Sequence, residues 1–96
     1  MGAHRLIVEE KRDQINELVR RHRGHAVALF GSAARGDDTP DSDIDFLVEF
    51  DKGSSLFDLM DLQEALENLL GVPVDVVSVG GLKARDEHIR REAIPM

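Results

Sequence analysis

Apolar residues recur at intervals of three and four positions in two long segments of the chain. This spacing places them on one face of a helix and predicts amphipathic helices over residues 6–22 and 56–70. Ser55 is suited to cap the start of the second helix, and Gly71 is suited to end it. The repeated apolar positions are Ile7, Val8, Ile15, Leu18 and Val19 in the first helix and Leu56, Leu59, Leu62, Leu66, Leu69 and Leu70 in the second.

Three shorter apolar segments have the pattern of β-strands. Residues 26–30, AVALF, form a buried-strand pattern that ends at Gly31. Residues 43–50, DIDFLVEF, alternate between two faces, and residues 72–79, VPVDVVSV, are rich in β-branched side chains and interrupted only by Asp75. In residues 43–50, one face takes Ile44, Phe46, Val48 and Phe50, and the other takes Asp43, Asp45, Leu47 and Glu49.

The remaining segments complete the predicted order of elements. Residues 32–36 suit one or two turns of helix, and residues 37–42 form a proline-containing loop. A polar C-terminal helix is expected over residues 82–93, stopped by Pro95. The order α-β-α-β-α-β-α predicts an α/β fold in a single domain spanning residues 1–96.

The composition is that of a globular domain: of the 96 residues, 42% are hydrophobic and 32% are charged, and none is cysteine. The lack of cysteine excludes a disulfide framework and a thiolate metal site. No apolar run approaches the roughly 20 residues that span a bilayer. The start of the chain lacks the apolar core of a secretory signal, so we expect a cytoplasmic protein with no membrane association.

A net charge of −7 disfavours general nucleic-acid binding, because an acidic surface repels the phosphate backbone. The chain also has no Trp or Tyr and only four Phe, so it lacks the aromatic stacking surfaces of single-strand binders. Binding of one nucleotide through metal ions stays compatible with this charge.

Aspartates in two predicted strands have the spacing and setting of metal ligands. Asp43 and Asp45 point to one face, roughly 6.5–7 Å apart, and disfavour each other's ionisation unless cations lie between them. Their hard oxygens suit Mg²⁺ or Mn²⁺, which also bridge substrate phosphates. Asp75 lies among β-branched residues, where packing seldom requires an acid. If its strand lies beside the other, three carboxylates converge and can hold two metal ions.

The Gly31-Ser32 turn supplies groups that can bind phosphate. Gly31 lets the backbone approach a ligand closely, and the amides of Ser32 and Ala33 can donate to phosphate oxygens. The Ser32 hydroxyl adds a hydrogen bond, and Arg35 adds a positive charge. Glycine and serine after a strand usually form no more than a turn, so this interpretation depends on the aspartates nearby.

The same aspartates do not fit a calcium-binding EF-hand loop. With Asp41, Asp43 and Asp45 at loop positions 1, 3 and 5, Phe46 falls where the invariant glycine belongs. Lys52 then falls where the bidentate glutamate is needed, so this alternative fails.

The other polar residues of interest have ordinary interpretations. Asp37, Asp38 and Asp41 are interpreted as solvated loop charges rather than ligands. The histidines show no metal-ligand spacing and are interpreted as surface or packing residues. They are His4, His22, His25 and His88.

Residues 31–48, GSAARGDDTPDSDIDFLV, resemble the signature of the DNA-polymerase-β-like nucleotidyltransferase superfamily. In that signature a strand leads into Gly-Ser, and a spacer separates this pair from Asp-x-Asp on the next strand. The Ala-Arg-Gly after Gly-Ser and the Ser-Asp-Ile-Asp are similar to the minimal nucleotidyltransferase (MNT) branch. The resemblance covers essentially the whole chain and implies the nucleotidyltransferase fold, a small mixed β-sheet flanked by helices.

The resemblance also implies roles for individual residues. Gly31 and Ser32 match the pair that holds the nucleotide's β/γ-phosphates, and Asp43 and Asp45 match the two metal-binding carboxylates. Asp75 matches the third acid, which helps one metal and activates the attacking hydroxyl. The implied cofactors are two Mg²⁺ ions, with Mn²⁺ as an alternative, and the implied substrate is ATP.

Stand-alone minimal members of this family typically occur with a HEPN-domain RNase toxin. The resemblance therefore implies an antitoxin that transfers AMP from ATP to a tyrosine of the toxin, in a homo-oligomer or a hetero-oligomer. Because the chain has no acceptor domain, we expect exposed apolar surface on the helix over 56–70 or on the C-terminal one.

Two other functions stay open. The chain could neutralise a partner by covering its site, with the nucleotide as a structural ligand. It could also be an enzyme for a small acceptor such as an aminoglycoside, although the short chain leaves little to build an acceptor pocket.

Overall fold

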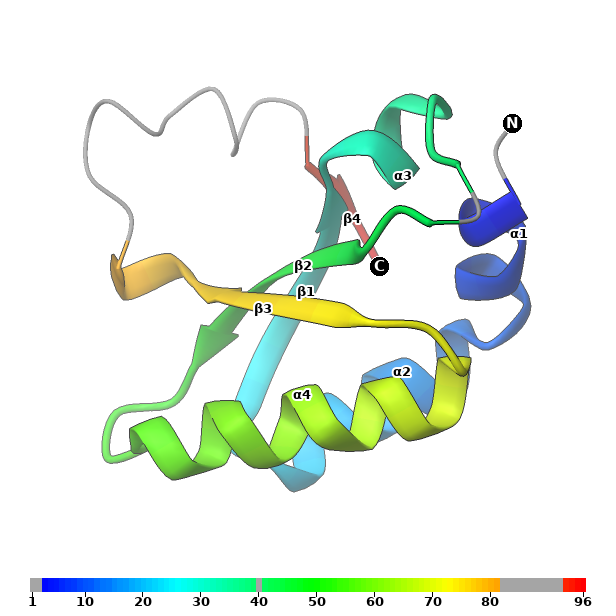
Figure 1. Cartoon of the computed structure of the whole chain (residues 1–96). Coiled ribbons are helices and arrows are strands. Elements are labelled where there is room, and N and C mark those ends of the chain that lie inside the picture. Colours follow the sequence, from blue (N-terminus) through cyan, green and yellow to red (C-terminus); the bar gives the residue numbers. More distant parts are fainter. Residues whose placement is uncertain (1–2, 40, 82–92) are drawn as a thin grey trace.

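The computed structural model describes residues 3–39, 41–81 and 93–96. The predicted mixed α and β architecture is confirmed (Figure 1). The elements are α1 (Ala3–Glu10), α2 (Arg12–Arg21), β1 (Gly24–Phe30), α3 (Ser32–Arg35), β2 (Ile44–Phe50), α4 (Leu56–Leu70), β3 (Val74–Ser78), the 3-10 helix η1 (Val79–Gly81) and β4 (Ile94–Pro95).

Within the described residues, the strands form one four-stranded mixed sheet in the order β3-β2-β1-β4. β2 pairs antiparallel with β1 and parallel with β3, and β4 pairs antiparallel with β1. The parallel pair is joined by α4, which crosses beneath the sheet together with α2 (Figure 1). The central position of β2 places its residues between both neighbouring strands.

The hydrophobic core lies between the sheet and the helices α2 and α4. The alternation expected over residues 43–50 is seen here, because Ile44, Phe46 and Val48 are all 0% exposed. Burial of side chains of this size stabilises the fold by about 1.5–3 kcal/mol each, relative to leaving them exposed. The other large buried side chains are Ile15 and Val19 from α2, Leu62 and Leu66 from α4, and Val8 from α1.

Side chains of α4 cover the outer edge of β3. The backbone N–H of Val74 donates to Oε2 of Glu67 at 3.0 Å, and the N–H of Val76 donates to Oε1 of Gln63 at 3.2 Å. These bonds satisfy donors that an edge strand would otherwise leave unpaired. They also fix β3 against α4 on both sides of Asp75.

The single helix expected over residues 6–22 is wrong, because the chain forms α1 and α2 with a turn at Lys11. The apolar repeat passes from Val8 to Ile15 with charged residues at the intermediate positions 11 and 12. No apolar side chain there holds the helix against the core. The break lets α1 pack toward α3 while α2 packs on the sheet.

The carboxyl-terminal prediction is also corrected. Residues 82–92 of the expected C-terminal helix lie outside the described residues, but residue 93 is not helical and β4 follows it. Ile94 and Pro95 pair with Leu29 and Ala28, and the N–H of Met96 donates to the Val27 carbonyl at 3.0 Å. Proline is tolerated here because β4 is an edge strand, where its missing N–H is not needed.

The first two turns of α4 carry exposed apolar side chains. Leu56 is 69% exposed, Phe57 is 74% exposed and Met60 is 54% exposed. Exposed apolar surface was expected on this helix. None of the helices in residues 3–39, 41–81 and 93–96 has the length and hydropathy needed to cross a membrane.

Two leucines of α4 test this packing. We expect Leu66→Ala to lower the free energy of unfolding by about 2–5 kcal/mol, because it leaves a cavity in the core. Leu56→Ala on the exposed turn is the matched control and should change stability by no more than about 0.5 kcal/mol. Urea unfolding followed by circular dichroism measures both. Equal effects of the two variants would contradict the core described above.

Candidate active site

β1 ends in a tight turn, Gly31-Ser32, that leads directly into α3. Gly31 has φ of 75°, a backbone conformation that glycine adopts without strain. A Cβ at this position would collide with Oδ2 of Asp45. Conformation and space therefore both require glycine here, and the turn lies directly against the Asp45 carboxylate.

The register of the parallel strands brings Asp45 and Asp75 side by side. Paired side chains on neighbouring strands point to the same face, with the strands about 4.8 Å apart. This face is opposite the core, because the adjacent residues Ile44 and Val74 are buried against the helices. Asp43 precedes β2 by one residue and is exposed.

Asp45 experiences the charges of the other site residues. Its burial raises the pKa of the Asp45 carboxyl above its ordinary value. The negative charges of Asp75 and then Asp43 raise this pKa further, whereas the positive charge of Arg35 lowers it. The charges of Asp43, Asp75 and Arg35 therefore all act on the Asp45 carboxyl.

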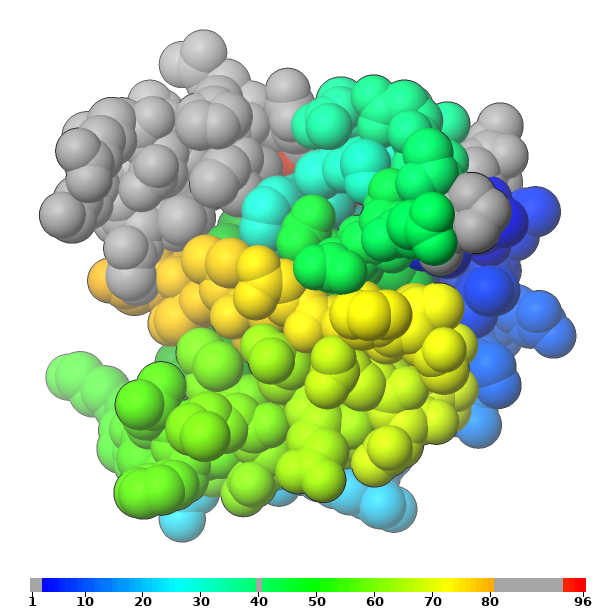
Figure 2. Space-filling view, in the orientation of Figure 1, coloured from blue at the N-terminus to red at the C-terminus, as the bar shows by residue number. Residues whose placement is uncertain are grey.

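The surface location of β3 leaves this environment accessible. In Figure 2, β3 forms a band at the surface between α4 and the segment that contains α3 and the start of β2. Asp75 is exposed and Asp45 is half-buried. A ligand can therefore reach both carboxylates from solvent while it contacts the Gly31-Ser32 turn.

The carboxylates do not form a complete metal cage on their own. In the parts of the chain that the structure describes, no group of three or more His, Cys, Asp or Glu side chains could hold a metal ion. The donor set nevertheless fits Mg²⁺, which uses hard oxygens and usually takes one or two carboxylates together with substrate phosphates. Asp43, Asp45 and Asp75 suit an ion that arrives with a nucleotide.

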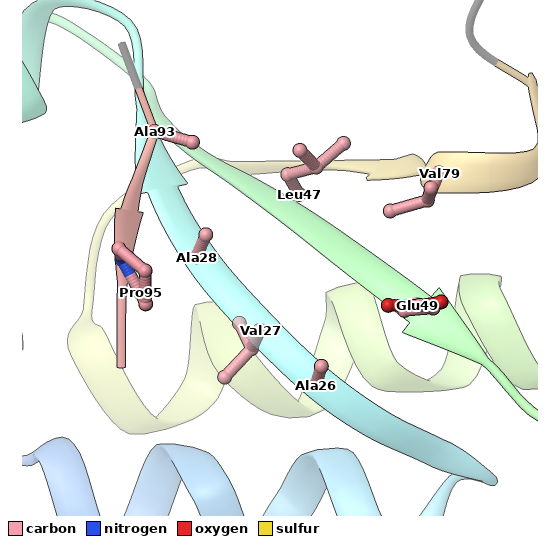
Figure 3. A pocket seen from close by; sticks show the side chains of 8 residues that line it. All are labelled: Ala26, Val27, Ala28, Leu47, Glu49, Val79, Ala93 and Pro95. Atoms are coloured by element: carbon pink, nitrogen blue, oxygen red, sulfur yellow. The ribbon is translucent and has the colours of Figure 1, made fainter. Parts of the chain in front are cut away.

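A shallow pocket of about 260 Å³ lies farther along the same sheet face (Figure 3). Leu47 follows Asp45 by two residues, and Ala28 lies opposite Leu47 on β1. The alternation placed Leu47 on the polar face, yet it is only 6% exposed. The pocket is lined mainly by apolar side chains, namely Ala26, Val27, Ala28, Leu47, Val79, Ala93 and Pro95, together with Glu49.

Asp38 does not fit its interpretation as a solvated loop charge. Its side chain is 1% exposed and lies against His4, which is itself 3% exposed. By contrast, Asp41 is exposed, and Asp37 is exposed and accepts a hydrogen bond from Nε of Arg35 at 3.2 Å. The loop before β2 thus carries one buried acid among exposed ones.

The histidines are surface or packing residues as expected, where they are described. The buried His4 packs beside Asp38, and His22 contacts the Leu18 carbonyl at 2.7 Å. His25 is exposed and contacts Oδ1 of Asp51 at 2.7 Å. His88 lies outside the described residues.

Arg5 is a residue near the site that the sequence patterns did not indicate. Its guanidinium Nη1 donates to the Ala34 carbonyl of α3 at 3.2 Å. No local motif could have found this contact, because the two residues lie 29 positions apart.

The family of the chain follows from comparison with known proteins. Residues 11–94 match the nucleotidyltransferase domain family, and the chain belongs to that family. The chain is 43% identical over 68 residues to the protein adenylyltransferase MntA of Thermococcus cleftensis. The aligned segment covers 71% of this chain and 69% of MntA.

Solved structures agree with this assignment. A structure provisionally described as a minimal nucleotidyltransferase superposes with a TM-score of 0.87 and 44% identity, covering 100% of this chain and 97% of that one. The resemblance to the MNT branch is thereby confirmed. A chain in the structure of tri-AMPylated Shewanella oneidensis HEPN toxin in complex with MNT antitoxin has the same fold. It superposes with a TM-score of 0.69 and 19% identity, and the match covers 91% of this chain and 69% of the matched chain.

The raised pKa of Asp45 predicts a pH-dependent stability. The folded chain binds the Asp45 proton more tightly than the unfolded chain does, so folding loses stability as the pH rises through the raised pKa. Without nucleotide or divalent cation, Asp45→Asn should therefore unfold at a higher urea concentration than wild type at pH 7. The difference should shrink at pH 3, where Asp45 is protonated.

Asp41→Asn is the matched control for this measurement, because Asp41 is an exposed acid in the preceding loop. It should follow the wild type at both pH values. An Asp45→Asn protein that is less stable than wild type at pH 7 would contradict the electrostatic description of the site.

Proposed function

We propose that this protein is a Mg²⁺-dependent adenylyltransferase that moves AMP from ATP to a tyrosine hydroxyl of a HEPN toxin and so acts as its antitoxin. The observation that carries the proposal is the juxtaposition of the Gly31-Ser32 turn with the in-register pair Asp45 and Asp75. The relative MntA, named a protein adenylyltransferase, supports the activity. A neighbour of the same fold, solved with a tri-AMPylated HEPN toxin, supports the partner.

The turn is proposed to hold the β- and γ-phosphates of ATP. The backbone amides that follow Gly31 and the Ser32 hydroxyl donate to phosphate oxygens, and Arg35 adds a positive charge. Bound Mg²⁺ supplies Lewis-acid stabilisation of the phosphates and of the leaving pyrophosphate. Asp43, Asp45 and Asp75 would hold the metal, which compensates the negative charge that raises the pKa of Asp45.

The proposed reaction is an in-line displacement at the α-phosphorus. The tyrosine oxygen forms a bond to that phosphorus while the bond to the bridging oxygen of the β-phosphate breaks, so pyrophosphate leaves. Asp75 accepts the phenol proton in this proposal, in the role that the family resemblance implies for the third acid. Asp45, held against the turn, would hold the metal beside the phosphates, since a carboxylate alone repels a phosphate group.

The pocket beside Leu47 favours an aromatic acceptor over a sugar. It begins about 7 Å along the strand from Asp45, and the described residues that line it are mainly apolar, with Glu49 as the one acid among those described. An apolar lining of this kind suits a phenol ring and its flanking residues. Within the described residues, a polycationic aminoglycoside would find one carboxylate in this pocket.

The proposal is tested by transfer of radiolabelled AMP from α-labelled ATP to a HEPN toxin in the presence of Mg²⁺. Wild type should label the toxin, and labelling should be lost on addition of EDTA and in the Asp43→Asn/Asp45→Asn double variant. Toxin neutralised equally well by this variant, with its binding retained, would favour inhibition by occlusion. Efficient labelling of free aminoglycosides would favour a small-molecule enzyme.

Asp75→Asn separates chemistry from nucleotide binding. Its Mg²⁺-ATP affinity should stay within a few fold of wild type, because the phosphate contacts at Ser32 and the carboxylate of Asp45 survive. Its transfer rate should fall by roughly 10²–10⁴-fold, as for other losses of a positioned base. Calorimetric affinity set beside the labelled transfer rate measures both. Transfer at the wild-type rate would remove Asp75 from the site.

A further inference from the structure

We infer that α1 is a positioning element that fixes both halves of the active site through Arg5 and through the contact between His4 and Asp38. The inference rests on the proposed function, since it concerns the same site. α1 precedes residues 11–94, over which the chain matches its family, so the match assigns α1 no role. The structure supplies two separate contacts that carry this inference.

The first contact holds the phosphate-binding half. Arg5 Nη1 donates to the carbonyl of Ala34 at 3.2 Å, near the end of the four-residue helix α3. α3 is too short to be stable by itself, so its position depends on its packing. Ala33 and Ala34 are buried, and Arg5 fastens the end of α3 opposite Ser32. A shift of α3 would move the amides proposed to hold phosphate.

The second contact holds the loop that leads to the aspartates. The backbone N–H of His4 donates to Oδ2 of Asp38 at 3.1 Å, and Nδ1 of His4 lies 3.5 Å from the same oxygen. Both side chains are almost fully buried. The bond from the His4 N–H therefore ties the Asp38 side chain to α1, and Asp38 lies in the loop five residues before Asp43.

These contacts act on one continuous segment. α3 ends at Arg35 with Gly36 as its C-cap, and the N–H of Asp37 donates to the Ser32 carbonyl at 3.1 Å. Asp38 comes next, and the loop then enters β2 at Ile44, whose N–H donates to the Pro73 carbonyl at 3.0 Å. α1 therefore holds the segment between the Gly31 turn and β2 at two points. The distance between the Gly31 turn, proposed to bind phosphate, and the carboxylates of β2 depends on both contacts with α1.

Buried contacts of this kind can also serve stability alone, and the test must separate the two roles. Asp38→Ala removes the acceptor of the His4 N–H, whereas Asp38→Asn keeps an amide oxygen that can still accept it. Asp41→Ala is the matched control in the exposed part of the loop. Val19→Ala is the comparator for stability, because Val19 is buried in α2 and contributes no group to the site.

Steady-state transfer with varied Mg²⁺-ATP gives kcat and KM for each variant, at a temperature where all are folded. Because a misplacement of about 1 Å can lower the rate by about 100-fold, Asp38→Ala should lower kcat by about 10- to 100-fold. Arg5→Ala should raise the KM for ATP by about tenfold, since it releases α3. Asp38→Asn should stay within a few fold of wild type.

Two results would overturn the inference. One is that Arg5→Ala and Asp38→Ala match Asp41→Ala in kcat and KM. The other is that Val19→Ala, at equal or greater loss of stability, shows the same kinetic losses. Each would assign the contacts to stability alone.

A wild-type protein that neither binds ATP nor transfers AMP would instead contradict the proposed function. The positioning role is then measured from the amide chemical shifts of Ser32 and Asp45. Arg5→Ala and Asp38→Ala should displace these signals, and Asp41→Ala should leave them in place. Unchanged shifts in the first two variants would overturn the positioning role independently of activity.

Discussion

The register of β2 against β3 is the constraint on which the rest of the site depends. On one side of these strands, Ile44 and Val74 are buried under α4, so on the other side Asp45 and Asp75 must be neighbours. A slip of either strand by one residue would turn its aspartate toward the hydrophobic core. The core therefore keeps the two carboxyl groups side by side, and the burial of Asp45 and then the charge of Asp75 raise the pKa of the Asp45 carboxyl.

Much of this arrangement could be predicted from local patterns. The helix over residues 56–70 was predicted with its observed bounds, because its leucine spacing and its flanking Ser55 and Gly71 all indicate the same element. The alternation over residues 43–50 predicted both faces of β2, including the side on which Asp45 lies. The pairing of Asp45 with Asp75 was a conditional expectation, since no local pattern says which strands become neighbours.

The features that were missed all depend on contacts distant in sequence. The turn at Lys11 arises because α1 and α2 pack against different parts of the fold. β4 has two residues, and only its pairing with β1 makes it a strand. Asp38 has the same loop setting as Asp41, yet it is buried because α1 lies across it. Neither composition nor hydrophobic periodicity indicates which distant segment packs against each of these residues.

The proposed site would let an acidic chain bind a nucleotide. Its carboxylates gather where a cation would offset them, and the groups proposed to bind phosphate are uncharged backbone amides beside Gly31 together with Arg35. Belonging to the nucleotidyltransferase family gives this arrangement a known chemical context. The nucleotide and the metal are then expected to bind together rather than in sequence at separate sites.

The central claim is that the Gly31 turn and the aspartates of β2 and β3 form one metal-nucleotide site. Paramagnetic broadening by Mn²⁺ in the presence of a non-hydrolysable ATP analogue measures this directly by NMR. We expect the amide signals of Ser32, Asp45 and Asp75 to broaden most. The amide signals of those α4 residues that lie too far from the Mn²⁺ to be affected should stay sharp. Broadening centred on the exposed acids around His25, with Ser32 and Asp75 unaffected, would contradict the account.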